Sequence, residues 1–282
     1  MRRSSCPYVR AYRLPKHGEP DSSCQDAFGI APFVHTRRAA SARPRSMAAP
    51  LSLDRANGAM RRQVWAGVGH RLRLAVADGA TTTACSGPWA ETLATAAVKY
   101  PAPWEDLEIF PARMRELRRA WAEQARASLP ASIPWYAQTA LDGGAFSTVV
   151  RVAVLGRGWE ADGWGDSCLF HVRQGRPIQI LPPMGVDDFA AAPCMVASVP
   201  GKDGHLREHL FSGSGILEQG DVLLLATDAL ACWLIDQGTF ETSLEELLSM
   251  DGRAAFASWV EDKRKHHGMK NDDTTLVLAE FP

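Results

Sequence analysis

Residues 71–79 read Arg-Leu-Arg-Leu-Ala-Val-Ala-Asp-Gly. Polar and apolar residues alternate at the start of this run and the rest is wholly apolar, as in a strand that enters a core. The apolar run stops at Asp78-Gly79. We therefore predict a buried β-strand from Arg71 that carries a carboxylate at its end.

Four further acidic sites occupy comparable places, namely Asp26, Asp166, Asp228 and the pair Asp272-Asp273. All except Asp26 follow or close an apolar run. A buried strand normally ends in residues that can face water, so one such aspartate means little. The whole set suggests oxygen ligands gathered at one edge of a sheet. Ordinary turn or helix N-cap chemistry remains the alternative for each single position.

Composition describes an ordinary globular chain that is long enough to bury a substantial core. Its 282 residues are 46% hydrophobic and 22% charged, with a formal net charge of −1. A near-neutral chain gives no indication of nucleic-acid binding, which usually shows a strongly basic domain. Six scattered cysteines form no Cys-x-x-Cys pair, and no signal peptide or long apolar span is evident. We therefore expect a cytoplasmic protein with no membrane partner and no cysteine-based zinc site.

Two segments lack regular patterns within what we expect to be a single domain spanning 1–282. An Arg-rich stretch at about 31–62 is predicted to be a long loop insertion after a short strand over 26–30. That loop is either a solvated insertion without a role or a docking site for an acidic or phosphorylated partner. A Pro- and Gly-containing stretch at about 181–214 is predicted to be an irregular flap.

The remaining patterns alternate between strands and helices and indicate an α+β domain. Ser86 is the predicted N-cap of the first helix, and Gly165-Asp166 is the predicted corner of a strand meander. Predicted strands cover 145–154, 159–166, 167–172, 222–226 and 274–279, and predicted helices cover 86–98, 104–129, 229–237, 243–250 and 253–265.

The residue types at the strand ends suit a hard divalent cation. Carboxylates, backbone carbonyls and water are the ligands that Mg²⁺ and Mn²⁺ prefer, and no His-Glu-x-x-His pattern is present to favour zinc. Two such ions about 4 Å apart can share a hydroxide and hold a phosphoryl group for in-line attack. Without metal, the same carboxylates should repel one another and raise some of their pKa values.

Six motifs carry a resemblance to a known family. They are Cys-Gln-Asp-Ala-Phe at 24–28, Val-Ala-Asp-Gly at 76–79, Gly-Gly-Ala-Phe-Ser-Thr at 143–148, Gly-Asp-Ser at 165–167, Leu-Leu-Leu-Ala-Thr-Asp at 223–228 and Asn-Asp-Asp-Thr-Thr-Leu-Val at 271–277. In this order they resemble the motifs of the metal-dependent type 2C (PPM) protein serine/threonine phosphatases, particularly the bacterial ones. Single motifs of this length are weak signals, but the ordered set is strong.

The resemblance implies a four-layer α-β-β-α sandwich, in which two antiparallel sheets are flanked by helices, and a centre of two Mn²⁺ or Mg²⁺ ions at one end. Asp78 would bridge both ions, the Gly79 carbonyl would hold one, and Asp228 and Asp272 would hold the other. Asp26 would act directly or through water, and Asp166 matches the position of a third, weaker ion. In this family the nucleophile is a metal-activated water, so the catalytic positions include Asp78 and Asp228.

This chain departs from the family at two places that concern phosphate binding and proton transfer. Eukaryotic members have a His two residues after the bridging Asp, where this chain has Ala80. The family's phosphate-binding Arg is missing before the first motif, and Arg13, Lys16 and His17 are the candidates to replace it. His17 is also a candidate proton donor, with an exposed loop histidine as the alternative.

The sequence is thus interpreted as a bacterial phosphatase that removes phosphate from serine or threonine of a phosphorylated protein, reversing a cognate Ser/Thr kinase in signalling. Two alternatives stay open. One is a degenerate phosphatase that serves as a phosphoprotein-binding scaffold, although every ligand position is filled here. The other is a hydrolase of a small phosphorylated metabolite, since the same centre can accept different leaving groups.

Overall fold

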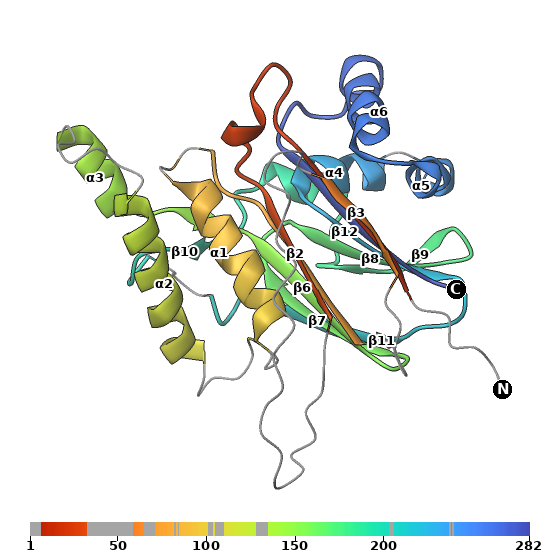
Figure 1. The fold of residues 1–282 in the computed structure, drawn as a ribbon, viewed down its shortest axis with the longest axis horizontal. Helices are drawn as coiled ribbons and strands as arrows, with labels where there is room; N and C mark the ends of the chain where they lie inside the picture. The colour runs from red at the N-terminus through yellow and green to blue at the C-terminus, as the bar shows by residue number, and fades with distance from the viewer. Residues whose placement is uncertain are drawn as a thin grey trace, which may run out of the picture.

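The computed structural model describes residues 7–32, 59–64, 71–81, 83, 85–100, 104, 110–127, 135–202, 206–236, 238 and 240–282. Within these residues two antiparallel sheets lie face to face and helices cover both outer faces (Figure 1). This arrangement confirms the predicted α+β class and its four layers. None of the helices in the described part of the chain combines the length and apolar character that crossing a bilayer requires.

The larger sheet has six strands in the order β3-β1-β13-β12-β8-β9. Its strands are β1 (Tyr8–Leu14), β3 (Ala59–Val64), β8 (Cys168–Arg173), β9 (Arg176–Leu181), β12 (Asp221–Ala226) and β13 (Thr274–Phe281). Its outer face packs against α4 (Asp228–Asp236), α5 (Phe240–Ser249) and α6 (Arg253–His266). The short helices η1 (Asp21–Ser23) and η2 (Val186–Ala190) lie in the connections.

The second sheet has five strands in the order β11-β7-β6-β4-β2. They are β2 (Ala27–Pro32), β4 (Arg71–Ala77), β6 (Val149–Leu155), β7 (Gly158–Trp164) and β11 (Phe211–Ile216). Helices α1 (Ser86–Lys99) and α2 (Phe110–Ala127) pack on its outer face, and α3 (Trp135–Gly143) follows α2. A separate two-stranded ribbon joins β5 (Phe146–Ser147) to β10 (Val196–Ala197).

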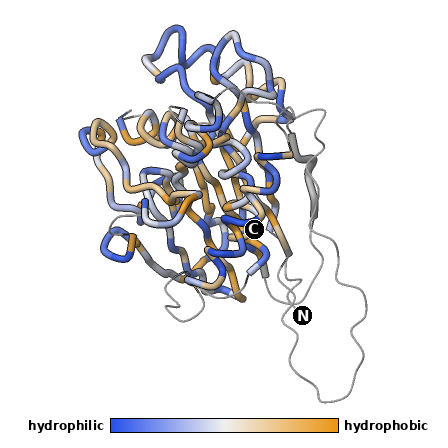
Figure 2. The backbone as a smooth tube through the Cα atoms, turned by 90° about the vertical axis from the view of Figure 1, so that its left-hand side faces the viewer, coloured by the Kyte–Doolittle hydropathy of each residue, from blue (hydrophilic) through white to orange (hydrophobic). Residues whose placement is uncertain are grey.

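Side-chain alternation along the strands creates one apolar layer between the sheets and one under each helical layer. In β4, Leu72, Leu74 and Val76 enter the layer between the sheets, while Ala75 and Ala77 pack under α1. Accordingly, hydrophobic residues predominate in the central strands, and hydrophilic residues are common in the outer loops (Figure 2). Both faces of the central strands are therefore buried, which explains their wholly apolar runs.

Two buried arginines in the strands have a structural purpose. Arg73 of β4 donates to the carbonyl oxygens of Val98 (2.9 Å) and Lys99 (3.3 Å) at the end of α1. Arg10 of β1 donates to the carbonyl oxygens of Leu248 (2.6 Å) and Met250 (3.0 Å), where α5 ends. The last carbonyl groups of a helix have no hydrogen-bond donor within the helix, and each arginine supplies one. Each arginine thereby joins a sheet to the helix that covers it.

The Gly165-Asp166 corner was predicted to join two strands of one meander, and this prediction was wrong. β7 belongs to the five-stranded sheet and β8 to the six-stranded sheet, so the corner carries the chain from one sheet to the other. Gly165 has φ of +92°, and a Cβ on it would lie 2.4 Å from the Cγ2 atom of Thr148. Only glycine combines this backbone conformation with such a close approach. The crossing leaves Asp166 between the two sheets.

Several predicted boundaries also need correction. The predicted loop at 31–62 overlaps two strands, because β2 extends to Pro32 and β3 begins at Ala59; the rest of that prediction, at 33–58, lies outside the described part of the chain. The first helix begins at Ser86 itself, with Cys85 as its N-cap in a left-handed conformation (φ 59°), and Ser86 donates instead to the carbonyl of Thr83. Strands β1, β3, β9, β10 and β11 and helix α3 were not predicted.

The second helix and the flap differ from prediction in extent. Helix α2 covers 110–127 where 104–129 was predicted, and its buried stripe consists of Met114, Leu117, Trp121 and Ala125. The predicted strand over 145–154 is divided into β5 and β6. The flap at 181–214 contains η2, β10 and the start of β11, so the described part of it is less irregular than expected.

Candidate metal centre

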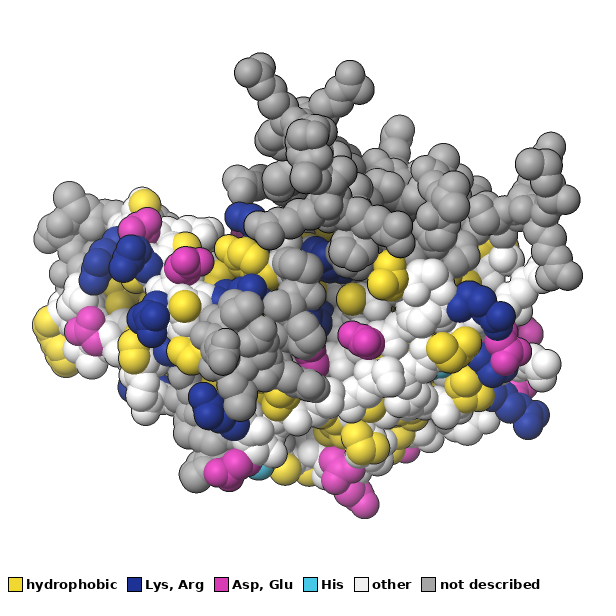
Figure 3. Space-filling view, turned by 90° about the horizontal axis from the view of Figure 1, so that it is seen from below, with side chains coloured by type: hydrophobic (Ala, Val, Ile, Leu, Met, Phe, Trp, Pro, Cys, Tyr) yellow, Lys and Arg dark blue, Asp and Glu magenta, His cyan; other side chains and the backbone are white. Residues whose placement is uncertain are grey.

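Strand register places all the predicted acidic residues at one end of the sandwich. Ala27 pairs with Ala77, so Asp26 and Asp78 flank the same end of the β2–β4 pair. Ala226 pairs with Leu276 and also with Cys168, so Asp228, Asp272 and Asp166 reach the corresponding end of the six-stranded sheet. At the opposite end of the sandwich, the described acidic and basic side chains are interspersed (Figure 3). Five chain segments distant in sequence therefore converge at one end.

One threonine links the carboxylates of the two sheets. Asp26 Oδ2 accepts a hydrogen bond of 2.8 Å from Thr227 Oγ1. Asp78 lies near enough to Asp26, Asp228 and Asp166 for their charges to raise its pKa. The side chains of Asp26 and Asp166 are buried, at 1% and 7% exposure. The cluster is thus partly closed to solvent.

Burial and mutual repulsion raise the pKa values of three of these carboxyls. Burial, with a further contribution from Asp273, raises the pKa of Asp26 to about 8. Burial together with Asp228 raises the pKa of Asp166 to about 6. The pKa of Asp78 lies well above its usual range because of burial and the charges of Asp26, Asp228 and Asp166. Such a group of repelling carboxylates binds a proton or a cation readily.

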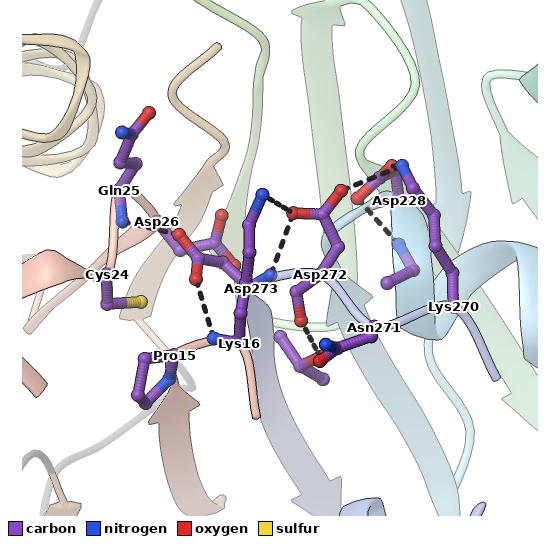
Figure 4. A network of polar contacts seen from close by, with 12 residues as sticks. Pro15, Lys16, Cys24, Gln25, Asp26, Asp228, Lys270, Asn271, Asp272 and Asp273 are labelled. Atoms are coloured by element: carbon purple, nitrogen blue, oxygen red, sulfur yellow. Dashed lines mark hydrogen bonds and ion pairs between the residues drawn. The ribbon is translucent and has the colours of Figure 1, made fainter. Parts of the chain in front are cut away.

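Two lysines hold the other side of the cluster (Figure 4). Lys270 Nζ lies 2.9 Å from Asp228 Oδ2 and 2.8 Å from Asp272 Oδ2, so one ammonium group bridges two carboxylates. Lys16 Nζ lies 2.9 Å from Asp272 Oδ1. Burial raises the pKa of Asp272, but the hydrogen bonds from Lys270 and Lys16 outweigh burial, so its pKa lies below the usual range.

Asp273 and Arg13 position the backbone around the cluster. Asp273 accepts hydrogen bonds from the backbone N–H of Gln25 (2.6 Å) and of Lys16 (3.0 Å), which ties the segments before β2 and after β1 to the start of β13 (Figure 4). Arg13, a predicted phosphate ligand, donates through Nη1 to the carbonyl oxygen of Asp26 at 2.9 Å. Arg13 thus supports the segment that presents Asp26.

Gly79 lies where its neighbours leave no room for a side chain. A Cβ on it would come within 2.8 Å of the carbonyl oxygens of Gln25 and Ser86. Hydrogen bonds on both sides hold it in place, from Thr148 N–H to the Asp78 carbonyl (2.9 Å) and from Ala80 N–H to the Phe146 carbonyl (2.9 Å). This close packing fixes the backbone on which Asp78 is mounted.

His17 lies at the edge of this region with its side chain directed to another partner. Its Nδ1 is 2.5 Å from Glu261 Oε2 on α6, and its side chain is 57% exposed. Its backbone N–H donates to Asn271 Oδ1 at 2.8 Å. Among the three predicted phosphate ligands, Lys16 is the one whose side chain contacts a carboxylate of the cluster. The role of His17 stays a prediction.

Sequence reasoning missed Lys270 and Thr227. Lys270 precedes Asp272 by two residues, and Thr227 precedes Asp228 by one. Both adjoin residues that were recognised, so the signal was their nearness in sequence to a predicted ligand. What the sequence did not reveal is that Lys270 reaches across from the β13 segment to α4.

The carboxylate oxygens of the cluster are suitable ligands for a divalent cation, although their side chains do not form a complete coordination site. Among the described residues, no group of three His, Cys, Asp or Glu side chains stands in a ready metal-holding arrangement. However, Asp26 Oδ1 and Asp166 Oδ1 are buried oxygens with no hydrogen-bond partner. Buried carboxylate oxygens without a donor are costly unless a cation or proton meets them. All-oxygen donors of this kind suit Mg²⁺ or Mn²⁺.

The two-sheet sandwich with carboxylates at one end is the fold of the PPM-type serine/threonine phosphatases. The structure is similar to the Mycobacterium tuberculosis serine/threonine phosphatase PstP/Ppp, with a TM-score of 0.53 and 16% identity over 98% of this chain and 99% of that one. It is also similar to PppA, a key regulatory component of T6SS in Pseudomonas aeruginosa (TM-score 0.50, 19% identity, 99% of each chain).

One further solved structure contains ions. The catalytic domain of PstP in complex with two manganese ions has a TM-score of 0.50 and 20% identity over 97% of this chain and 98% of that one. No family model matches the sequence, and no curated protein matches it. At these identities the likeness establishes the fold, and the chemistry rests on the residues described above.

Proposed function

We propose that this protein is a metal-dependent phosphatase that hydrolyses phosphoserine or phosphothreonine on proteins. The observation that carries the proposal is the convergence of Asp26, Asp78, Asp166, Asp228 and Asp272 at one end of a PPM-type sandwich, with two buried carboxylate oxygens lacking a hydrogen-bond donor. The mutual repulsion of these groups is destabilising without a counter-charge, and a functional site is where such an arrangement is expected.

Each carboxylate has a distinct place in the proposed centre. Asp78 would be a ligand of both Mn²⁺ or Mg²⁺ ions, the Gly79 carbonyl would hold one of them, and Asp228 and Asp272 would hold the other. Asp26 would act directly or through water, and Asp166 would hold a third, weaker ion. When bound, the ions supply Lewis-acid activation of a water molecule and neutralise charge on the phosphoryl group.

The lysines supply the positive charge that the proposed reaction needs beside the carboxylates. Lys16 lies within 2.9 Å of Asp272, so its ammonium group is placed to bind the phosphate of the substrate at this rim. His17 remains a candidate for protonating the leaving group, which requires its imidazole to leave Glu261. A comparison of His17→Ala with the native protein on aryl phosphates of differing leaving-group pKa tests that role, since a proton donor matters most for poor leaving groups.

The proposed setting is a bacterial cytoplasm, with a cognate Ser/Thr kinase supplying the phosphorylated protein. Among the described residues, Cys24, Cys85, Cys168 and Cys232 carry free thiols, which supports a reducing compartment. The fold of protein phosphatases supports a protein substrate over a small metabolite.

The test is hydrolysis of a phosphopeptide panel with Mn²⁺, with Mg²⁺ or with a chelator. We expect metal-dependent release of phosphate by the native protein and a loss of at least 100-fold in Asp78→Asn, because removal of a catalytic electrostatic group typically costs ~10²–10³ in rate. Asp142→Asn on α3 is the matched control and should keep full activity. Full activity of a folded Asp78→Asn protein would refute the assignment.

One alternative has an observation in its favour. The ion pairs of Lys270 partly neutralise Asp228 and Asp272, so these two carboxylates have a counter-charge from the protein itself, which favours a scaffold without metal or turnover. Calorimetric titration with Mn²⁺ separates the two functions. A phosphatase gives a heat of Mn²⁺ binding, whereas a scaffold of this kind gives none.

A further inference from the structure

A pocket of about 280 Å³ opens beside the carboxylate cluster, between α4 and η2. Its lining includes Asp228 and Lys270, which belong to the cluster, and continues over Val186, Phe189, Cys232 and Trp233. The pocket is smaller than the ~300–1,000 Å³ typical for a whole small-molecule ligand. Its size suits one side chain of a larger substrate.

Helix α4 builds one wall from a single stripe of residues. Asp228 and Cys232 are four residues apart, as are Ala229 and Trp233, so all four face the same side of the helix. With a rise of about 1.5 Å per residue, Trp233 lies about 7.5 Å along the helix axis from Asp228. The pocket therefore runs outward from the cluster by about that distance.

The outer part of the pocket is apolar and well supported. Trp233 is 6% exposed, its Nε1 donates to the His267 carbonyl (3.1 Å), and its ring meets Trp259 edge-on at 5.3 Å. From the other side, η2 contributes Val186, which is 38% exposed, and the partly buried Phe189. An exposed aliphatic residue above a fixed indole makes a surface that favours apolar contact.

We propose that this pocket binds an apolar side chain of the phosphorylated protein, two residues from the phosphorylated residue. This proposal rests on the proposed function. The pocket and the cluster share Asp228 and Lys270, so a substrate whose phosphate lies at the cluster can place a neighbouring side chain in the pocket. In an extended segment, side chains two residues apart lie on the same face at about 6.6–6.8 Å. That spacing is close to the rise of about 7.5 Å along the axis of α4 between Asp228 and Trp233.

The charges of the lining select against an acidic neighbour. Two carboxylates, Asp228 and Asp236, line the pocket with one ammonium group, Lys270. An acidic side chain would lie beside Asp236 and lose contact with water, so its binding is disfavoured. The expected order of preference at this position is leucine or methionine first, then alanine, then aspartate.

The test uses peptides that carry a phosphonate mimic of phosphoserine, so binding is measured whether or not the protein hydrolyses phosphate. Fluorescence anisotropy with Mn²⁺ present compares Leu, Ala and Asp at the second residue before and the second residue after the phosphonate. At one of these two positions, we expect Leu to bind about tenfold more tightly than Ala, and Asp to bind more weakly than Ala.

Two exposed aliphatic residues provide a matched pair of variants. Val186→Asp places a charge in the pocket and should reduce the Leu-to-Ala ratio to within about twofold. Ile178→Asp on β9 makes the same chemical change at a residue that is 52% exposed and outside the pocket lining, and should leave the ratio unchanged. Filling the pocket with Cys232→Leu should reduce the ratio as Val186→Asp does.

The proposal is overturned if the native protein binds no peptide, if Leu and Ala bind equally at both positions, or if Val186→Asp and Ile178→Asp have the same effect. Hydrolysis is measured in parallel on the matching phosphopeptides. A Leu preference without Mn²⁺-dependent hydrolysis supports the pocket and contradicts the proposed phosphatase function. Hydrolysis without any preference contradicts the pocket alone.

Discussion

Lys270→Met should increase the affinity of the protein for Mn²⁺. The Lys270 ammonium group lies 2.9 Å from Asp228 and 2.8 Å from Asp272, the two carboxylates proposed for one ion. An arriving cation must displace this group or bind close to it. Removal of the lysine charge therefore relieves repulsion and frees two ligands.

The size of the effect follows from the charge separation and the exposure of the lysine. Two unit charges about 4 Å apart interact by about 1 kcal/mol in water and by about 4 kcal/mol at an effective dielectric constant of about 20. The Lys270 side chain is 63% exposed, so the lower part of this range applies. We expect a gain of about 1–2 kcal/mol, which is a factor of about 5–30 in the dissociation constant.

Isothermal titration calorimetry with Mn²⁺ at low ionic strength measures this change directly. Lys265→Met is the matched control, since it removes the same charge from a residue that is 55% exposed and pairs with Glu261 at 3.7 Å. The difference between the two variants should shrink as salt is added, because exposed charges are screened. Equal affinities for both variants, or weaker binding by Lys270→Met, would refute the reasoning.

Three further predictions concern stability. The pKa of Asp26 is about 8 in the folded protein against an ordinary 3.8, so its bound proton stabilises the fold fully below about pH 4, and this stability is lost as the pH rises toward 8. The melting temperature of the metal-free protein should therefore fall between pH 4 and pH 8. Asp26→Asn should make this fall smaller. Arg10→Ala should lower the free energy of unfolding by about 2–4 kcal/mol, because the carbonyl groups at the end of α5 lose their charged donor. Arg176→Ala is the control and should change the free energy of unfolding little, because the Arg176 side chain is 77% exposed. Urea denaturation measures both variants. Gly79→Ala should lower both stability and Mn²⁺ affinity, because its Cβ would press on backbone oxygens at 2.8 Å; calorimetry showing unchanged metal binding in a folded protein would count against the described packing.

The strand pattern at 71–77 predicted β4 because a strand buried on both faces must be apolar throughout its buried length. The alternation at the start of this run did not indicate where Arg73 lies. Its side chain is 7% exposed and joins the strand to the end of α1. A charged residue that caps a distant helix and one that faces water give the same local pattern, so only the packed fold distinguishes them.

The acidic cluster was predictable because each aspartate follows or precedes a strand, and strand ends in a two-sheet sandwich lie at the same edges. Which sheet each strand joins was not predictable in the same way. Gly165-Asp166 suits a tight hairpin as well as a crossing between sheets, since both need a glycine with positive φ. The choice depends on strand pairing between residues far apart in sequence.

The lysine bridge was beyond local reasoning for a related reason. Lys270 is adjacent to a recognised motif, yet its significance comes from Asp228, which lies 42 residues earlier in the chain. His17 shows the opposite case, because its distance from the first motif suggested a catalytic position. In the structure its imidazole is held by Glu261 of α6, a contact that spacing along the sequence could not indicate.

We propose that aspartates from both sheets hold divalent cations at one end of the sandwich. Anomalous diffraction of crystals soaked in Mn²⁺ tests this proposal. We expect two strong peaks within coordination distance of Asp78, one also near the Gly79 carbonyl and the other also near Asp228 and Asp272. Peaks confined to other surfaces, or none at this end in crystals that bind Mn²⁺ elsewhere, would contradict it.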